Sequence, residues 1–350
     1  MGVTVRLDEP RWQQHLASVV AETPAAVPVV KGHGYGFGLV RLAAECRRLG
    51  VGTIAVGMPS EVAVVRDVFE GDIVVLQPYD PRDGLARTLL GDPRVVTTVS
   101  RLDDLRGLAA DGHRPRVLVE VLTSMRRHGL AADELAVAGP LLEGLGLEGW
   151  TIHLPLREEG RHAEAVRLAR AALGTRPGTL WLSHLPAAEV RALAAELGGA
   201  DGPVPVRARV GTRLWLGDAG GRRTTATVLD VHRVARGERA GYHGRTVPGA
   251  GWVVVMAGGT SHGVGLEAPT SATTWRQRAT ALAAGSLEAT GRALSPFTID
   301  GRKRWFLEPP HMQSSLVFLP ASGIPPQVGD ELPLELRLTI ATPDAVILSP

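Results

Sequence analysis

Short apolar runs alternate with longer amphipathic stretches between residues 26 and 216. Runs of valine, isoleucine and leucine without a polar face are typical of strands that are buried on both sides, as in a parallel sheet. In chain order the runs are AVPVVK, which ends at Lys31, GTIAVG, DIVVLQ, RVVTTV, RVLVEVL, GWTIHL, TLWLS and PVRARV. They recur about every 20 to 30 residues, which is the length of one strand–helix unit.

The stretches between the runs have helical spacing. Between the first two runs, the apolar positions are Leu39, Leu42, Ala43, Cys46 and Leu49. This spacing places Cys46 on the apolar face of a helix, where it is expected in the core rather than as a reactive thiol. Eight strand–helix units predict a closed (β/α)8 TIM-like barrel. An open doubly wound sheet is the alternative, although GHGYGFG at 32–38 lacks the GxGxxG spacing.

The pattern changes after residue 217. DAGGRR reads as a linker, and the segments that follow are rich in β-branched residues and glycine-containing turns. They are TATVLDVHRVARGERAGYHGRT, GWVVVMAGG, SSLVFLP and LPLELRLTIA, with one helix expected over 275–293. We therefore expect a barrel domain over residues 1–218 and a mostly β C-terminal domain over residues 219–350.

Charge and composition limit the classes of partner. The chain has 38 basic and 36 acidic residues, a net charge of +2, and no block of basic residues. This balance argues against a nucleic-acid or membrane-surface partner. The single cysteine excludes an intramolecular disulfide, and the first residues lack the layout of a signal peptide. No apolar run approaches the ~20 residues that span a bilayer. These features predict a soluble, cytoplasmic protein.

Lysine is scarce in this chain, which makes its position at the end of the first run informative. Lys31 and Lys303 are the two lysines in the sequence. Burial lowers the pKa of a lysine, and a neutral amine is what imine formation requires. Arginine cannot supply such an amine. Lys31 is therefore a candidate for a Schiff base with pyridoxal phosphate; the alternative is a lysine that extends to solvent or pairs with an acid.

Other polar residues end the later runs. Arg127 follows the fifth run, His153 ends the sixth, Ser183 the seventh and Arg209 the eighth. In a parallel barrel the C-terminal ends of the strands form one mouth, where active sites are built. Each residue also has a structural explanation: a core histidine, a serine that caps a helix, or a surface arginine. Their convergence with Lys31 depends on the count of eight strands.

Several segments resemble alanine racemases. VVKGHGYGFG is similar to the lysine segment of that family, roughly VVKADAYGHG. Later segments resemble the family in the same order: EVLTSMRRHGL resembles KVDTGMGRLGF, IHLP resembles THFA, RVGTRLWLG resembles RPGIALYG, GYHGRT resembles SYGRT, and HMQSSLVF resembles the MDQ segment. The chain is identified by this resemblance as a diverged member of the alanine racemase family.

The resemblance implies roles for residues at the barrel mouth. Lys31 would carry pyridoxal 5'-phosphate and act as one of two proton-transfer bases. Arg209 would pair with the pyridine nitrogen, which limits the cofactor as an electron sink. His153 would pack against the pyridine ring. Arg127 would approach the cofactor hydroxyl or the substrate carboxylate.

The resemblance also implies a phosphate site and an assembly. Tyr35 would lie near the phosphate, and Ser183 with the backbone of Gly211 and Thr212 would hold it after the seventh and eighth strands. The family implies a small amino-acid substrate and a homodimer with its site at the subunit interface.

The second base departs from the family pattern. GTSHG at 259–263 resembles the family's GYADG, so Thr260 stands where the tyrosine base is expected. Threonine is a poor base, and His262 is the candidate replacement; its alternative is a loop histidine with no role. Gln313 stands where an aspartate is usual. Glu120 corresponds to a carbamylated lysine and supplies a carboxylate that would orient Arg127.

These observations predict a pyridoxal-phosphate-dependent amino-acid racemase, an isomerase, with an altered second base. The alternatives are another reaction on an amino acid, such as decarboxylation, elimination or epimerisation, and a pyridoxal-phosphate-binding protein without turnover. No metal site is predicted, because the His–Cys pairing of zinc-bearing relatives of this fold is absent around His262 and His311.

Overall fold

The computed structural model describes residues 2–112, 114–156, 159–200, 202–266 and 293–350. These residues fold into two compact units. The barrel unit is Gln13–Gly217, and the β unit combines Met1–Trp12 with Asp218–Pro350. Among the described residues, no helix is both long enough and apolar enough to cross a membrane.

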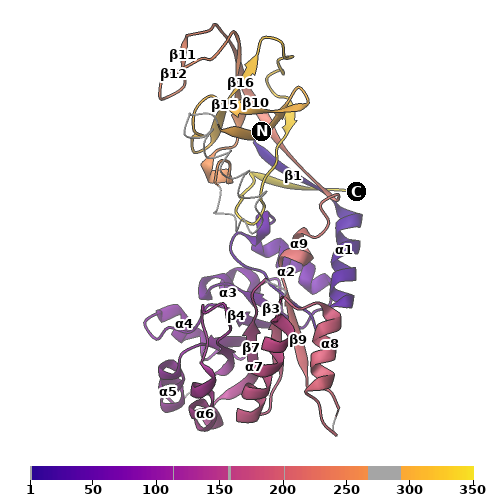
Figure 1. The fold of residues 1–350 in the computed structure, drawn as a ribbon, viewed down its shortest axis with the longest axis vertical. Helices are drawn as coiled ribbons and strands as arrows, with labels where there is room; N and C mark the ends of the chain where they lie inside the picture. The colour runs from indigo at the N-terminus through magenta and orange to yellow at the C-terminus, as the bar shows by residue number, and fades with distance from the viewer. Residues whose placement is uncertain (1, 113, 157–158, 201, 267–292) are drawn as a thin grey trace. The chain divides into compact units, whose positions relative to one another are not determined.

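A ring of parallel strands forms the centre of the barrel unit (Figure 1). In the described part of this unit the strands are β2 (Val27–Pro28), β3 (Thr53–Val56), β4 (Asp72–Val75), β5 (Val95–Val99), β6 (Arg116–Val121), β7 (Gly146–His153), β8 (Leu180–Ser183) and β9 (Val206–Val210). β2 pairs with β9, and a parallel bridge between Val29 and Ala55 joins β2 to β3. The ring is therefore closed, the predicted (β/α)8 barrel is confirmed, and the open-sheet alternative is wrong.

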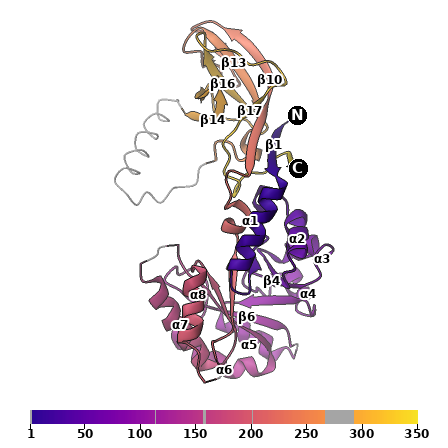
Figure 2. The same cartoon turned by 90° about the vertical axis from the view of Figure 1, so that its right-hand side faces the viewer.

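Helices cover the outside of these strands (Figures 1 and 2). They are α2 (Leu39–Arg48), α3 (Pro59–Arg66), α4 (Gly84–Leu89), α5 (Leu102–Ala110), α6 (Ala132–Leu141), α7 (Arg161–Thr175), α8 (Ala187–Glu196) and the short α9 (Thr212–Leu216), with α1 (Glu9–Glu22) before β2. α2 buries Leu42, Ala43 and Cys46, which are the positions its apolar spacing predicts. An inner cluster fills the ring: Val27, Val29, Ala55, Val74, Val96, Leu118 and Trp181.

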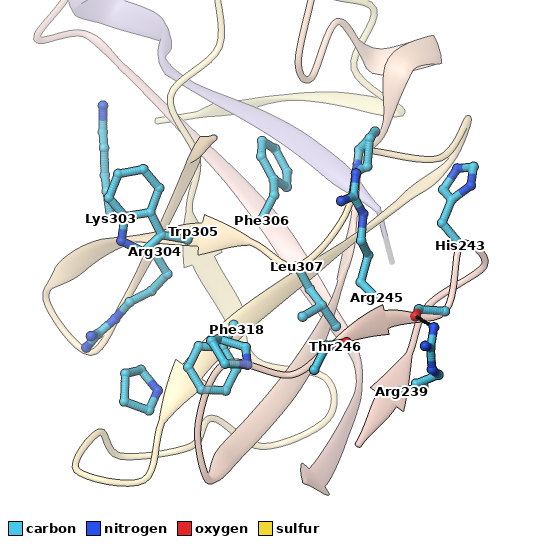
Figure 3. Close-up of a pocket in the computed structure, with 14 residues that line it drawn as sticks. Arg239, His243, Arg245, Thr246, Lys303, Arg304, Trp305, Phe306, Leu307 and Phe318 are labelled. Atoms are coloured by element: carbon cyan, nitrogen blue, oxygen red, sulfur yellow. Dashed lines mark hydrogen bonds between the residues drawn. The ribbon is translucent and has the colours of Figure 1, made fainter. Parts of the chain in front are cut away.

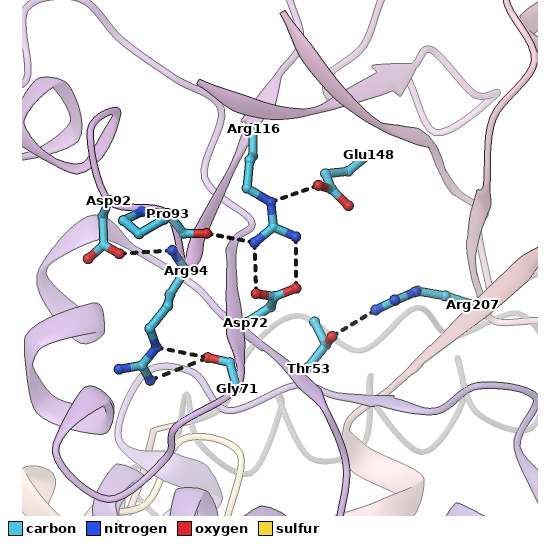
Figure 4. Close-up of polar contacts among 9 residues, drawn as sticks. All are labelled: Thr53, Gly71, Asp72, Asp92, Pro93, Arg94, Arg116, Glu148 and Arg207. Atoms are coloured by element: carbon cyan, nitrogen blue, oxygen red, sulfur yellow. Dashed lines mark hydrogen bonds and ion pairs between the residues drawn. The ribbon is translucent and has the colours of Figure 1, made fainter. Parts of the chain in front are cut away.

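An arginine clamp closes the N-terminal ends of the strands (Figure 4). The Arg116 guanidinium donates two hydrogen bonds to Asp72, of 2.7 and 2.8 Å, and one of 2.7 Å to Glu148. The same side chain donates to the carbonyl of Pro93 over 2.8 Å. The clamp ties β4, β6 and β7 together at the end opposite the mouth, where side chains of this fold serve stability rather than chemistry.

A largely antiparallel sheet forms most of the β unit. Its strands, as far as they are described, are β1 (Val3–Asp8), β10 (Arg222–Val234), β13 (Gly251–Ala257), β14 (Leu294–Ile299), β15 (Arg302–Phe306), β16 (Ser314–Pro320), β17 (Glu331–Pro333) and β18 (Ala345–Ser349). β11 (Arg239–Ala240) and β12 (Arg245–Thr246) form a separate hairpin. The expected mostly β architecture after the barrel is confirmed.

The structure differs from the sequence-based description in three places. β1 pairs with β10 and β18, so residues 1–12 belong to the β unit, whereas the expected boundary placed them with the barrel. The LPLELRLTIA segment contributes only the short β17 at its start. The helix expected over 275–293 lies, except for residue 293, outside the described residues.

Candidate active site

The loop after β2 presents Lys31 at the C-terminal end of the barrel. Tyr35 has a φ of 54° inside the short helix Gly34–Gly36, so the chain turns through the left-handed region immediately after Lys31. Glu61 on α3 holds this loop in place. Its carboxylate accepts hydrogen bonds from the backbone N–H of Gly32 over 2.7 Å and of Gly57 over 2.6 Å. Glu61 is buried, so the strand end is held by a desolvated charged group.

The Lys31 side chain is accessible, yet it lies among protein charges. Burial by the surrounding loops lowers the pKa of its ammonium, the positive charges of Arg127 and Arg209 lower it further, and Glu61 opposes them. The side chain of Lys31 is nevertheless exposed to solvent. Within the described part of the chain, no hydrogen-bond partner engages its Nζ, so the amine is available for chemistry.

Three polar residues lie in register at the ends of adjacent strands. His153 pairs with Ser183 across β7 and β8, and Ser183 pairs with Arg209 across β8 and β9. Nη2 of Arg209 donates to Nδ1 of His153 over 3.0 Å and to Oγ of Ser183 over 3.3 Å. Oγ of Ser183 lies 3.1 Å from the same Nδ1. The register of the parallel strands therefore assembles a small polar cluster.

Electrostatics keep the imidazole of this cluster neutral. Burial lowers the pKa of His153 to about 2, and the positive charges of Arg209 and Arg127 add to the shift. Burial also lowers the pKa of Arg209, to about 10, against the opposing charge of Glu120. Arg209 thus remains a cation at neutral pH. Its Nε is buried and has no hydrogen-bond partner among the described residues, so one donor of the cluster is unused.

The loop that carries Arg127 leaves β6 and returns beside it. Oγ1 of Thr123 donates to the carbonyl of His153 over 2.9 Å, which ties this loop to β7. Gly129 has a φ of 123°, and a Cβ there would lie 2.4 Å from the backbone nitrogen of Leu122. The Glu120 carboxylate accepts from Ser100 Oγ over 2.7 Å. No ion pair between Glu120 and Arg127 is found in the described residues, so the expected orienting contact is not formed here.

Tyr35 meets the start of α9. Its hydroxyl would lie 2.4 Å from a Cβ placed at Gly211, so only glycine fits between them. Burial raises the pKa of Tyr35 to about 12, and a hydrogen bond with Thr212 lowers it. The three residues expected around a phosphate are therefore adjacent. Ser183 hydrogen-bonds within the His153–Arg209 cluster, and its expected contact with the phosphate stays a prediction.

His262 lies in the β unit, in the short helix Thr260–His262. The side chain of His262 is buried. Its Nδ1 accepts from the N–H of Gly259 over 3.2 Å, and its Nε2 lies 3.1 Å from Oδ1 of Asp344. The structure thus brings Lys31, Tyr35, Arg127, His153 and Arg209 into one unit and leaves His262 in the other.

Sequence reasoning missed two residues at the barrel mouth. Glu61 was not recognised, although a glutamate in the first turn of a helix is a known capping signal. His184, directly after Ser183, was also missed. Its ring contacts that of His153 edge to face, with centroids 5.0 Å apart. Its place after a strand end was the available signal.

A cavity of about 960 Å³ lies elsewhere, in the β unit (Figure 3). Basic and aromatic side chains mix around it, among them Arg239, Arg245, Lys303, Trp305 and Phe318. None of the residues expected at the active site lines it. In the part of the chain that the structure describes, no group of three or more histidine, cysteine, aspartate or glutamate side chains is arranged to hold a metal ion.

A closed parallel barrel followed by a β unit is also the fold of solved alanine racemases. An alanine racemase from Bartonella henselae, solved with covalently bound pyridoxal phosphate, covers all of this chain with a TM-score of 0.71 and 16% identity, and the chain covers 100% of it. An alanine racemase from E. faecalis covers 99% of this chain, with 98% of its own length matched, a TM-score of 0.70 and 16% identity.

Comparison of the sequence with family profiles shows which family the chain belongs to. The profile described as "Alanine racemase, N-terminal domain" matches residues 8–193, and the chain belongs to this alanine racemase family. The alanine racemase of Desulfovibrio desulfuricans is 27% identical over 177 residues, which are 45% of this chain and 47% of that protein. A catabolic alanine racemase of Mesorhizobium japonicum is 32% identical over 164 residues, 43% of each chain. The chain thus matches under half the length of these relatives.

Proposed function

We propose that this protein is a pyridoxal-phosphate-dependent amino-acid racemase that acts on a small amino acid. The observation that carries the proposal is the convergence of Lys31, His153 and Arg209 from three strand ends on one mouth. Membership of the alanine racemase family supports it. A soluble, cytoplasmic enzyme that forms a homodimer, with the site completed at the subunit interface, is part of the same proposal.

The residues of the barrel unit fit this cofactor. Lys31 offers an amine without a hydrogen-bond partner among the described residues and with a lowered pKa, which is what covalent attachment to an aldehyde requires. The buried, unpaired Nε of Arg209 is a donor that a pyridine nitrogen would satisfy. Tyr35 and Thr212 supply hydroxyl groups beside Gly211, where a phosphate would be held.

Each residue then has a defined task. When bound, pyridoxal phosphate withdraws electrons from the substrate and makes its α-proton acidic. Arg209 stays charged and holds His153 in its neutral form through the bond to Nδ1. Arg127, exposed at the mouth, is placed to attract a substrate carboxylate. The Nζ of Lys31 would accept the α-proton of the substrate or deliver a proton to the α-carbon.

Proton exchange tests the proposal. The protein is loaded with pyridoxal phosphate and incubated in D2O with L-alanine, then with other small amino acids. Deuterium at the α-carbon together with formation of the opposite enantiomer is expected. Lys31→Arg, which keeps the charge but cannot form an imine, is the matched control and should abolish both signals. Release of CO2 or ammonia without inversion would replace racemisation by decarboxylation or elimination, and absence of any reaction would end the proposal.

A further inference from the structure

His184 occupies an unusual backbone conformation at the end of β8. Its φ is 63°, in the left-handed region that residues other than glycine rarely adopt. Such strained residues cluster at functional sites, because the surrounding structure must hold them. The conformation turns the chain immediately after Ser183, and the ring of His184 then lies perpendicular to that of His153, at an interplanar angle of 88°.

The charged groups that face His184 come from four other elements and are all positive. They are Lys31 after β2, Arg127 after β6, Arg161 on α7 and Arg209 on β9. Burial lowers the pKa of His184, and the four positive charges together lower this pKa further. In the described residues no hydrogen-bond partner engages its ring nitrogens. The lowered pKa favours the imidazole form of His184, whose ring nitrogens lie in the same mouth as the Lys31 amine.

His262 lacks this freedom. Its Nδ1 receives the N–H of Gly259, which caps the helix Thr260–His262, and its Nε2 faces Asp344. Asp344 in turn accepts from the backbone N–H of Val3 over 2.7 Å. Since these contacts join three segments of the β unit, the histidine already has a structural use. Proton transfer through His262 would require at least one of these bonds to open.

We propose that His184 is the second proton-transfer group of this site. His184 and Lys31 would each remove a proton from, or deliver a proton to, the α-carbon of the substrate. The inference rests on the proposed racemase function. In each direction one C–H bond breaks and its proton passes to one of the two nitrogens, while the other nitrogen delivers a proton to the same carbon. The net change is an inversion that consumes no oxidant or co-reactant. When His184 accepts the proton it acts as the neutral imidazole and the ammonium of Lys31 delivers the other proton. In the reverse direction the imidazolium of His184 delivers the proton and the neutral amine of Lys31 accepts.

Exchange measured from each enantiomer separately tests the inference. The cofactor-loaded protein is incubated in D2O with L-alanine or D-alanine, and the initial rate of α-proton loss is followed. His184→Asn should lower the rate from one enantiomer by ~10²- to 10⁴-fold while the other continues, since only one of two bases is removed. The cofactor spectrum should be unchanged. His162→Asn, which removes a histidine on the outer helix α7, is the matched control.

A second readout needs no cofactor. In the cofactor-free protein, the ring C–H signal that disappears in His184→Asn is titrated by NMR. Its midpoint should lie below the reference value of about 6.5 and rise in Lys31→Gln, because one facing positive charge is gone. A midpoint at or above the reference value would overturn the inference.

The outcomes separate the two proposals. If His184→Asn lowers exchange from both enantiomers equally or from neither, or if His262→Ala gives the one-sided loss, the inference fails and the racemase function stands. If the wild-type protein takes up the cofactor but exchanges no amino acid, or takes up no cofactor, both proposals fail together.

Discussion

Nη2 of Arg209 lies 3.0 Å from Nδ1 of His153, so the imidazole accepts a hydrogen bond from a guanidinium. An imidazole in this position carries its proton on Nε2 and cannot be protonated on Nδ1 without losing the bond. The neutral form of His153 is thereby built into the folded state.

Acid should therefore destabilise the barrel unit through His153. Because burial and neighbouring arginines lower its pKa to about 2 in the folded protein, against about 6.5 unfolded, its contribution to stability is present above pH 6.5 and lost as the pH falls below it. The loss is about 1.4 kcal/mol per pH unit between these two pKa values. Urea unfolding at several pH values measures this. His153→Gln should be less stable at neutral pH but have a flatter pH dependence; parallel curves would contradict the assignment.

Lys31 should be the point of cofactor attachment. Borohydride treatment of protein incubated with pyridoxal phosphate should fix the cofactor on the peptide that contains Lys31, and mass spectrometry locates it. Lys303, paired with Glu335 in the β unit, is the internal control and should stay unlabelled. Label on Lys303, or none after incubation, would show that the amine at the mouth has no such role.

The Arg116 clamp should matter for stability but not for chemistry. Arg116→Met leaves Asp72 and Glu148 without their shared cation and should lower the free energy of unfolding by about 2 kcal/mol. Arg106→Met removes an exposed pair with Asp103 and should cost no more than ~0.5 kcal/mol. Denaturant midpoints compare the two variants. Equal effects would mean that the clamp is no stronger than a surface pair.

Gly129 should be irreplaceable in the loop that carries Arg127. In Gly129→Ala the new Cβ meets the backbone of Leu122, so the loop must shift, at a cost of about 2 kcal/mol or more. Gly50→Ala is the control, since Gly50 has a φ of 68° but nothing within 4 Å of a Cβ. It should show the smaller cost of left-handed backbone alone, about 1 kcal/mol. Comparable thermal midpoints for the two variants would contradict the argument.

The barrel was predictable because its signals are local. Each strand is an apolar run, and the polar residue that ends it lies at the mouth, which is how Lys31, His153 and Arg209 were found. β1 was not assigned to the β unit, because its partners β10 and β18 lie more than 200 residues away in sequence and leave no mark on the local pattern.

The side-chain partners at the site were less predictable than the strands. Ser183 was expected at a phosphate, and the contacts that strand register gives it with His153 and Arg209 were not expected. A register is a property of neighbouring strands and cannot be read from one run. Likewise, the sequence could not show which side chain would contact the Glu120 carboxylate. The structure shows a hydrogen bond from Ser100 rather than an ion pair with Arg127.

The pairing of β1 with β10 and β18 has a consequence for biosynthesis. β1 lies between these two strands in the sheet. It is synthesised before the barrel unit, so it cannot complete its pairing until β18, which follows the barrel unit in the chain, has been synthesised. The barrel unit, whose strands mostly pair with their neighbours in sequence, can form in the meantime. A fragment that starts at Asp218 would lack the strand between β10 and β18. To express the β unit alone, residues 3–8 should be fused after β18, through a linker long enough to let them enter the sheet in their native, parallel direction.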